Sequence, residues 1–400
     1  MSKQVFIPLL FFISVFKFLA AQPFLAGQVY YTPDSLIEYR CGNLPLILSA
    51  PHGGYLSPAN FPDRSCPDAV TVRDGFTQEL TRAIDSLYLL RHGCRPHVVI
   101  NRLARTKLDP NRDLPLATCD SPQALAAWTA YHTFLDSART AVTRQFGKGL
   151  LLNIHGHAHA IARIELGYQL TGEQLRESDS AINAPFRVQR SGIRSLVQIN
   201  LTQYNHVALL RGEYALGTTL QTAGYPSVPS QSDPFPLASE PYFSGAYITE
   251  RHGSSSGGTI DAVQLEHYMA GIRDNAANRS KYADTLRDVT NRFLATHYFG
   301  NNAFLTSCSA APNSISAIQG KAVWFKMYPN PGSSFYIEAE THGELLIYDL
   351  QGKCLFKTPL TAGIQSVSPY LVAGIYYLKL RSQNQSTVWV RWLNTQTTPY

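Results

Sequence analysis

The stretch Leu150–His159, LLLNIHGHAH, constrains the fold of this chain more than any other. Its short apolar run is typical of a buried β-strand, and the run stops at His155. His157 and His159 then alternate with small residues. A buried strand that delivers imidazoles at its C-terminal end can hold a metal ligand rigidly at the rim of an α/β sheet. Any of these histidines could instead be a solvent-facing loop residue, and the pattern favours His155 as a ligand over the other two.

Residues 1–21 have the pattern of a secretory signal peptide, cleaved near Ala21. Lys3 gives a positive start, and Val5–Phe16 is an apolar run too short to span a bilayer. Removal takes away two lysines and no acids, so the net charge falls from +6 to +4, which is 32 basic minus 28 acidic residues. This mild excess, without a basic run, does not favour a nucleic-acid partner. We expect a protein that is exported through the periplasm, secreted or surface-bound, with no transmembrane segment.

The cysteines also point to an oxidising compartment. All six lie in the exported part, and no two have the CxxC spacing of a thiolate zinc site. An even number favours disulfide bonds. Four of the six lie between Cys41 and Cys119, so we expect two bridges at the front of the first domain, with the pairing open.

Residues 22–305 alternate short apolar runs with longer amphipathic ones, which predicts an α/β domain. We expect a mixed, mainly parallel sheet covered by helices, of a phosphorylase/hydrolase-like kind. Strands are predicted at 46–50, 98–100, 150–154 and 262–266, and helices at 74–90, 124–146 and 282–294. The polar segment 171–191 predicts an insertion or lid, and 216–256, rich in Pro, Ser and Gly, predicts a long loop over the site.

A second domain follows a change of composition after residue 305. Residues 306–320 are predicted to be a linker, and residues 321–400 a small all-β sandwich. Short strands are expected at 323–327, 334–338, 343–348, 374–380 and 387–392, with a hairpin turn at 349–352.

The candidate site residues follow predicted strands. A hydrolytic zinc site needs about three protein ligands, a carboxylate that handles a proton, and a cation that orients the substrate. His52 precedes two glycines that let a metal approach the backbone closely, and His155 occupies the equivalent place on another strand. Asp74 opens a predicted helix and is either the third ligand or a helix cap, with Glu79 as the other ligand candidate. Glu266 is either the general base or a solvated charge at a strand end.

The polar loop 105–113 supplies candidate cations. Three cations and two carboxylates in nine residues could form a solvated loop, yet an arginine beside an asparagine also suits a substrate carboxylate. Composition alone does not choose between these two interpretations. In a zinc hydrolase, Arg105 or Arg112 would hold the oxyanion or the substrate carboxylate. Gln264 lies on the same side of its strand as Glu266, and we assign it and His157 to substrate binding as well.

Several motifs occur in the order in which one enzyme family has them. They are SAPHGG (49–54), the Asp74 helix start, RTKLDPNR (105–112), AYH (130–132), NIHGH (153–157), SGAYITERHG (244–253) and AVQLE (262–266). Together they resemble the N-formylglutamate amidohydrolase family, which is related to zinc carboxypeptidases and aminoacylases. The resemblance covers most of residues 22–304.

This resemblance implies a zinc-dependent hydrolase of an amide C–N bond with metal-bound water as nucleophile. It implies His52, Asp74 and His155 as zinc ligands, Asn111 and Arg112 as binders of the substrate carboxylate, and Glu266 as the base. The family usually has an aspartate where this chain has Asn153, which would leave the imidazole less polarised. Export favours an N-acyl amino acid or a peptide-like substrate over N-formylglutamate. The alternatives are a non-catalytic surface binding protein that keeps the hydrolase fold, or a zinc carboxypeptidase.

The C-terminal domain resembles the sorting domain of the type nine secretion system. The pieces that carry the resemblance are MYPNP (327–331), LLIYDLQGK (345–353) and LVAGIYYLKL (371–380). It implies that the secretion machinery is a partner of this domain.

Overall fold

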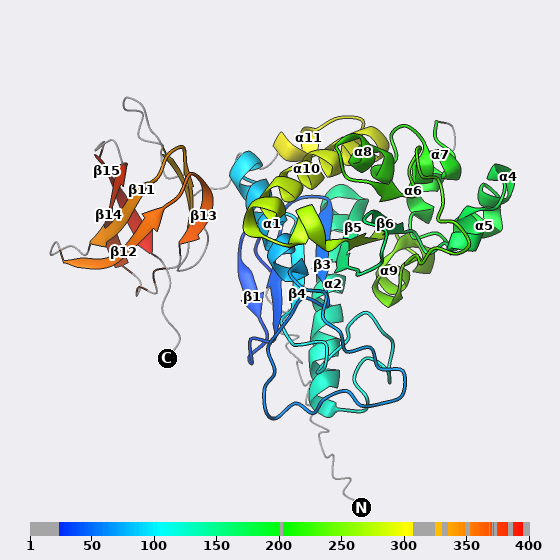
Figure 1. Cartoon of the computed structure of the whole chain (residues 1–400), viewed down its shortest axis with the longest axis horizontal. Helices are drawn as coiled ribbons and strands as arrows, with labels where there is room; N and C mark the ends of the chain where they lie inside the picture. Colours follow the sequence, from blue (N-terminus) through cyan, green and yellow to red (C-terminus); the bar gives the residue numbers. More distant parts are fainter. Residues whose placement is uncertain are drawn as a thin grey trace, which may run out of the picture.

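The computed structural model describes residues 24–200, 203–306, 325–329, 335–348, 353–367, 369, 371, 374–382 and 387–394. The predicted signal peptide, nearly all of the predicted linker and the predicted hairpin turn at 349–352 lie outside these residues. Figure 1 shows the α/β domain with its helices packed around a central sheet, and the β-rich C-terminal domain.

The α/β domain is built on one eight-stranded sheet with the order β1-β2-β4-β3-β5-β8-β6-β7. Its strands are β1 (Val29–Tyr31), β2 (Ile37–Arg40), β3 (Leu46–Ala50), β4 (His97–Asn101), β5 (Gly149–Gly156), β6 (Ile164–Gly167), β7 (Ser227–Val228) and β8 (Ile260–His267). The central strands β4, β3, β5 and β8 pair in parallel, whereas β1, β2 and β6 make antiparallel pairs. The predicted fold class, a mixed and mainly parallel sheet covered by helices, is therefore confirmed.

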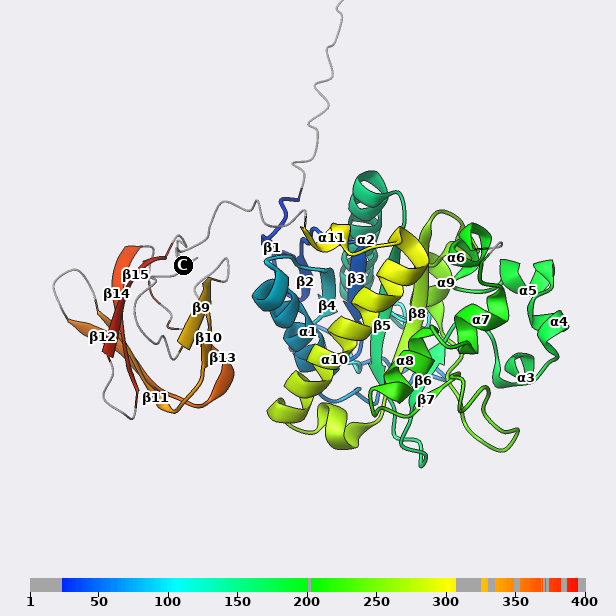
Figure 2. The same ribbon diagram turned by 90° about the horizontal axis from the view of Figure 1, so that it is seen from above.

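Helices cover both faces of this sheet, and the alternation of side chains along the strands explains why (Figure 2). In β3, Leu46 and Leu48 join the core beneath α1 (Thr77–His92) and α10 (Ala276–Leu294). Ile47 points the other way, into the core beneath α2 (Pro122–Phe146). Strands buried on both faces appear in sequence as continuous apolar runs, which is the pattern that predicted them.

The other helical segments of the domain are shorter. They are α3 (Gly172–Leu175), α4 (Asp179–Ile182), α5 (Pro185–Gln189), α6 (Arg194–Ile199), α7 (His206–Arg211), α8 (Leu216–Thr222), α9 (Tyr247–His252), η1 (Ser254–Ser256), η2 (Met269–Arg273), η3 (Ala295–Phe299) and α11 (Ala303–Thr306). The prediction of one long loop over 216–256 is wrong, because this segment contains α8, β7 and α9. Leu216 and Leu220 anchor α8 in the core despite the polar residues around them.

The start of α1 differs from the prediction. The helix begins at Thr77, and the residue before it, Phe76, has a left-handed backbone with φ of 65°. Asp74 therefore lies in the preceding loop and is not a helix cap; instead, its backbone carbonyl accepts a hydrogen bond from Thr77 Oγ1 (2.9 Å). The carboxylate of Asp74 is thus free to point away from the helix.

The C-terminal domain consists of two antiparallel sheets around one apolar core. One sheet has the order β13-β10-β9 and the other β12-β11-β14-β15. The strands are β9 (Phe325–Pro329), β10 (Phe335–Ala339), β11 (Gly343–Tyr348), β12 (Cys354–Leu360), β13 (Gly363–Val367), β14 (Gly374–Ser382) and β15 (Thr387–Asn394). Ile337 of the first sheet and Leu345 of the second share the buried core. The sequence predicted neither of the edge strands β12 and β13, and Pro359 in β12 suits such an edge position.

The disulfide arrangement corrects one expectation. Cys66 and Cys119 form a disulfide bond. Cys94 is also disulfide-bonded, but Cys41 is a buried free thiol. The front of the domain therefore does not hold two bridges among its four cysteines. The thiol of Cys41 instead donates to the carbonyl of Phe24 (3.5 Å). Among the residues described, no helix is long and apolar enough to cross a bilayer.

Replacing both Cys66 and Cys119 by serine is expected to lower the free energy of unfolding by about 2–5 kcal/mol, because the bond closes a long loop of the unfolded chain. The residues are separated by 53 positions in the sequence. Urea denaturation under oxidising conditions measures the effect. Cys354→Ser is the matched control, since Cys354 is an exposed free thiol. An unchanged midpoint in the double variant would contradict the prediction.

Candidate metal centre

The candidate site lies where β3, β5 and β8 end side by side, and backbone register places its side chains. β5 and β8 run in parallel with His155 paired to Glu266 and Asn153 paired to Gln264. The two residues on each strand are two positions apart, so all four side chains lie on the same face of the sheet. That face is the one covered by α2, because Leu151 and Ala262, two positions earlier on each strand, pack in the α2 core.

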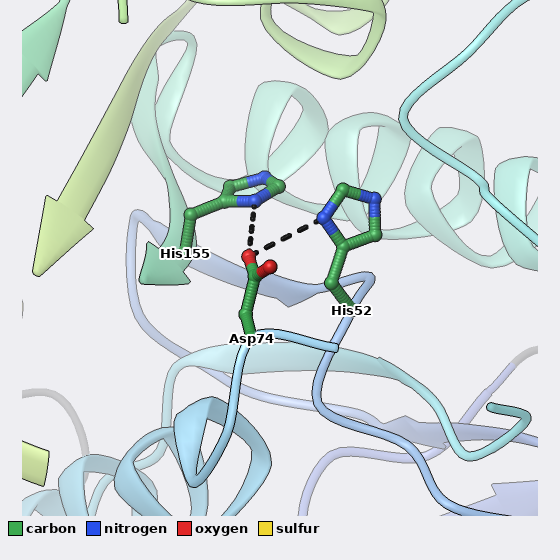
Figure 3. A group of neighbouring side chains, drawn as sticks. All are labelled: His52, Asp74 and His155. Carbon is green, nitrogen blue, oxygen red and sulfur yellow. Dashed lines mark hydrogen bonds and ion pairs between the residues drawn. The ribbon is translucent and has the colours of Figure 1, made fainter. Parts of the chain in front are cut away.

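Two histidines converge on one carboxylate at this edge (Figure 3). His52 Nδ1 lies 3.3 Å and His155 Nδ1 lies 3.0 Å from the same oxygen, Oδ2 of Asp74. All three residues are buried, and one ligand atom from each lies within 4.8 Å of the other two. Glu79, the other candidate for third ligand, is not part of this group.

The spacing of these three atoms suits a tetrahedral zinc ion. Two donors about 2.0–2.1 Å from such an ion lie about 3.3–3.4 Å apart, close to the two distances measured to Asp74 Oδ2. The ion would replace the ring protons that the two imidazoles now direct at Asp74. The donor set of two imidazole nitrogens and one carboxylate oxygen is also the set found in one class of hydrolytic zinc sites.

The outer nitrogen of His52 is fixed by a carboxylate that the sequence analysis did not single out. His52 Nε2 donates to Asp109 Oδ1 (2.6 Å), and Asp109 is fully buried. Burial alone would raise the pKa of Asp109, but His52 and Arg105 hold it well below its usual range. Burial likewise opposes protonation of His52, yet the carboxylate of Asp109 raises the pKa of His52 above its ordinary value. A carboxylate behind a histidine is the usual outer support of a zinc ligand.

The outer nitrogen of His155 faces amides instead. Asn153 Nδ2 lies 2.9 Å and Asn111 Nδ2 lies 3.2 Å from His155 Nε2. Burial lowers the pKa of His155 to about 4, so the ring is neutral. A zinc ion on Nδ1 would move the proton to Nε2, which then needs an acceptor. Asn153 Oδ1 is buried and has no hydrogen-bond partner among the described residues. Rotation of this amide would bring that oxygen to His155 Nε2, so the residues present fit a metal.

The predicted arginines differ in how they are engaged. Arg105 donates from Nε to Asp109 Oδ2 (3.0 Å) and lies 3.4 Å from Asp74 Oδ1, so it links the two carboxylates. Arg112 is half-buried, and its guanidinium makes no hydrogen bond or ion pair with the described part of the chain. Its backbone carbonyl accepts from Trp128 Nε1 (3.1 Å), which fixes the loop beneath it. Of the two predicted arginines, Arg112 is therefore the one whose guanidinium has no partner in the described part of the chain.

The predicted base lies beside the histidine pair. Glu266 Oε1 is 3.9 Å from His155 Nδ1 and accepts a hydrogen bond from Gln264 Nε2 (2.8 Å). Burial, followed by the nearby charge of Asp74, raises the pKa of Glu266 well above its usual value. Gln264 Oε1 also accepts a hydrogen bond from Asn111 Nδ2 (3.2 Å). The amide side chains of Asn111 and Gln264 therefore link the polar loop to Glu266.

The other residues predicted to bind substrate, Asn111 and His157, lie close to the site, and each makes a hydrogen bond to the protein backbone. Asn111 Oδ1 accepts the backbone N–H of Ile248 at the start of α9 (2.9 Å). His157 is buried, and its Nε2 donates to the carbonyl of Arg163 (2.8 Å). Neither contact tests the assignment of these residues to substrate binding.

Arg273 is a further supporting residue that no motif indicated. Its guanidinium donates to the carbonyls of Gly75 and His157, next to two of the converging residues. A Cβ on Gly156 would lie 2.3 Å from the guanidinium carbon, so only glycine leaves room for it. The Gly156 N–H in turn donates to Asp74 Oδ2 (3.2 Å).

Comparison with known proteins identifies the C-terminal domain. Residues 326–391 match the family described as the secretion system C-terminal sorting domain. This confirms the predicted type nine sorting domain, so the chain is exported to the cell surface or the extracellular space and engages the secretion machinery. No curated protein matches the chain.

Two solved structures show weak similarity. A gene product of Agrobacterium tumefaciens is 13% identical with a TM-score of 0.37, and the alignment covers 67% of this chain and 98% of that one. A β-glucosidase from Listeria innocua in complex with isofagomine is 10% identical with a TM-score of 0.15, covering 89% of this chain and 47% of that one.

Proposed function

We propose that residues 22–305 form a zinc-dependent hydrolase that cleaves the amide C–N bond of an N-acyl amino acid or a peptide-like substrate. The observation that carries the proposal is the convergence of two imidazole nitrogens on Asp74 Oδ2 at 3.3 and 3.0 Å, beside a buried glutamate. The ordered motifs that resemble the N-formylglutamate amidohydrolase family support the same chemistry. Export supports an extracellular substrate.

His52, Asp74 and His155 would hold the metal. When bound there, zinc would supply Lewis acidity, which polarises a substrate carbonyl and lowers the pKa of a water molecule. Asp109 would keep His52 oriented, and the amide of Asn153 would do the same for His155.

Glu266 would move the proton. Its Oε1 is occupied by the amide of Gln264 (2.8 Å), which leaves Oε2 to take a proton from the attacking water and to pass it to the leaving nitrogen. Burial keeps bulk water away from this carboxyl group, and its raised pKa means that the carboxylate holds a proton taken from water more firmly than an exposed glutamate would. Removing the glutamate would therefore affect turnover more than binding.

Two arginines would bind or stabilise negative charge on the substrate. Arg112 has no partner of its own in the described residues, so it suits a free carboxylate on the substrate. Arg105 is bonded to Asp109 and lies near Asp74, and we propose that it stabilises the oxyanion that forms as the amide is attacked.

The direct test uses the full exported chain, purified in the presence of zinc. We expect about one zinc per chain or more, together with hydrolysis of N-acyl amino acids or short peptides that chelators abolish and zinc restores. Metal content is measured by mass spectrometry, and hydrolysis by the amine released. Protein that takes up no zinc under metal-replete conditions would overturn the proposal.

Arg112→Ala is expected to raise KM by about 10- to 100-fold for substrates with a free carboxylate, because a charged hydrogen-bonded pair contributes about 1.5–3 kcal/mol. The same substrate with its carboxylate amidated should be hydrolysed equally by both proteins. Arg144→Ala is a suitable control, since Arg144 is exposed near the far end of α2. Equal loss on both substrates would show that Arg112 does not bind the carboxylate.

A further inference from the structure

A second group of metal-ligating side chains lies next to the first and shares no residue with it. His157 and His159 follow the end of β5, and Glu165 lies in β6. One ligand atom from each of the three lies within 4.8 Å of the other two. His157 and Glu165 are buried, whereas His159 is half-buried and gives the group an opening to solvent.

His157 is held in the orientation that a metal ligand needs. Its Nε2 donates to the carbonyl of Arg163 (2.8 Å), which fixes the proton on that nitrogen and leaves a lone pair on Nδ1. Histidines that bind metals almost always donate their other ring N–H to a carbonyl or carboxylate in this way. Among the residues that the structure describes, the Nδ1 lone pair accepts just the backbone N–H of His159, at 3.1 Å.

The other two side chains are held from outside the group as well. Glu165 Oε2 accepts the backbone N–H of Phe243 (2.8 Å), which leaves Oε1 facing His159 Nδ1 at 2.8 Å. The His159 ring stacks on Phe243 with centroids 4.7 Å apart and an interplanar angle of 12°. Each of the three residues thus has one contact that orients it and one atom directed into the group.

We propose that His157, His159 and Glu165 form a second transition-metal site that binds zinc. Two imidazole nitrogens and one carboxylate oxygen suit zinc and leave a fourth position open. The metal would displace the proton shared by His159 and Glu165 and the hydrogen bond to His157 Nδ1. A single hydrogen bond of this kind contributes far less free energy than a zinc site can supply.

The two sites are joined through the sheet. Glu165 in β6 pairs directly with Glu266 in β8, and Glu266 pairs with His155 in β5. The second site therefore lies on the strand beyond the proposed base, and a single residue, Gly156, separates His155 from His157. The full chain should bind two zinc ions, and the second ion does not depend on whether the first supports hydrolysis.

The test counts metal ions in the untagged full chain, stripped with a chelator and titrated with zinc. We expect two equivalents for the parent protein, one for His159→Gln, and one for His52→Ala through loss of the other ion. His342→Gln, which changes an exposed histidine of the C-terminal domain, should keep two. Circular dichroism checks the fold, and Glu165→Gln gives a second variant of the same site.

Saturation of the parent at one equivalent that His52→Ala removes and His159→Gln retains would overturn the second site while leaving the first intact. Retention of two equivalents in both His159→Gln and Glu165→Gln would overturn it as well. If the parent protein bound two zinc ions but hydrolysed no amide substrate, the proposed function would be wrong and the second site would stand. Cobalt absorption spectra, recorded for the same variants, distinguish loss of one site from weakening of both.

Discussion

Glu266→Gln is expected to reduce amide hydrolysis by about 100- to 10,000-fold while zinc binding is unchanged, which is the range of general acid–base contributions. Glutamine keeps the size of the side chain and its contact with Gln264, but it cannot take a proton from water. Initial rates and metal content, measured on the same preparation, test both parts.

The matched control for this prediction is Glu250→Gln, because Glu250 is an exposed glutamate of α9. It should retain both activity and metal. If Glu266→Gln lost zinc from the first site, Glu266 would be a ligand and its assignment as the base would be wrong. If it kept full activity, the proton would be moved by another group.

The second large effect is expected at Asp74, the carboxylate on which both histidines converge. Asp74→Ala should abolish zinc binding at the first site, because only two imidazoles then remain. Asp109→Asn should have a smaller effect, a loss of about 10- to 100-fold in zinc affinity, since Asp109 supports a ligand without contacting the metal. Competition with a chromophoric chelator measures both affinities.

Asp113→Asn serves as the control, because Asp113 belongs to the same loop as Asp109 and is exposed. It should bind zinc as the parent does. Equal losses in the Asp109 and Asp113 variants would indicate a general effect of loop charge, and would argue against a specific contact between Asp109 and His52.

The sequence predicted the parts of this protein that depend on local pattern. Strands buried on both faces, such as β3 and β5, leave continuous apolar runs, and their bounds differ from the prediction by two residues or fewer. His52 and His155 were found because each follows such a run. The short strands β1 and β2 were missed, because three or four residues are too few to establish a period.

The supporting residues could not be predicted in the same way. Asp109 contacts a histidine 57 positions earlier, and Arg273 reaches a carbonyl 198 positions away, so neither contact leaves a local pattern. Asp109 does lie in the polar loop that the sequence analysis identified, and its position two residues before Asn111 was a signal that could have been used. The start of α1 was misjudged for a related reason. Aspartate is a common helix-capping residue, but the carboxylate of Asp74 instead contacts the imidazoles of His52 and His155.

The pairing of β5 with β8 has a consequence for how this protein can evolve. Asn153, His155, Gln264 and Glu266 are spaced by backbone hydrogen bonds, and these do not depend on the identity of neighbouring side chains. The segment 216–256, in contrast, approaches the site from outside these two strands, for example where the Ile248 N–H donates to Asn111 Oδ1. Under the proposed function, changes in this segment would alter substrate preference, while the pairing of β5 with β8 keeps the four residues in register.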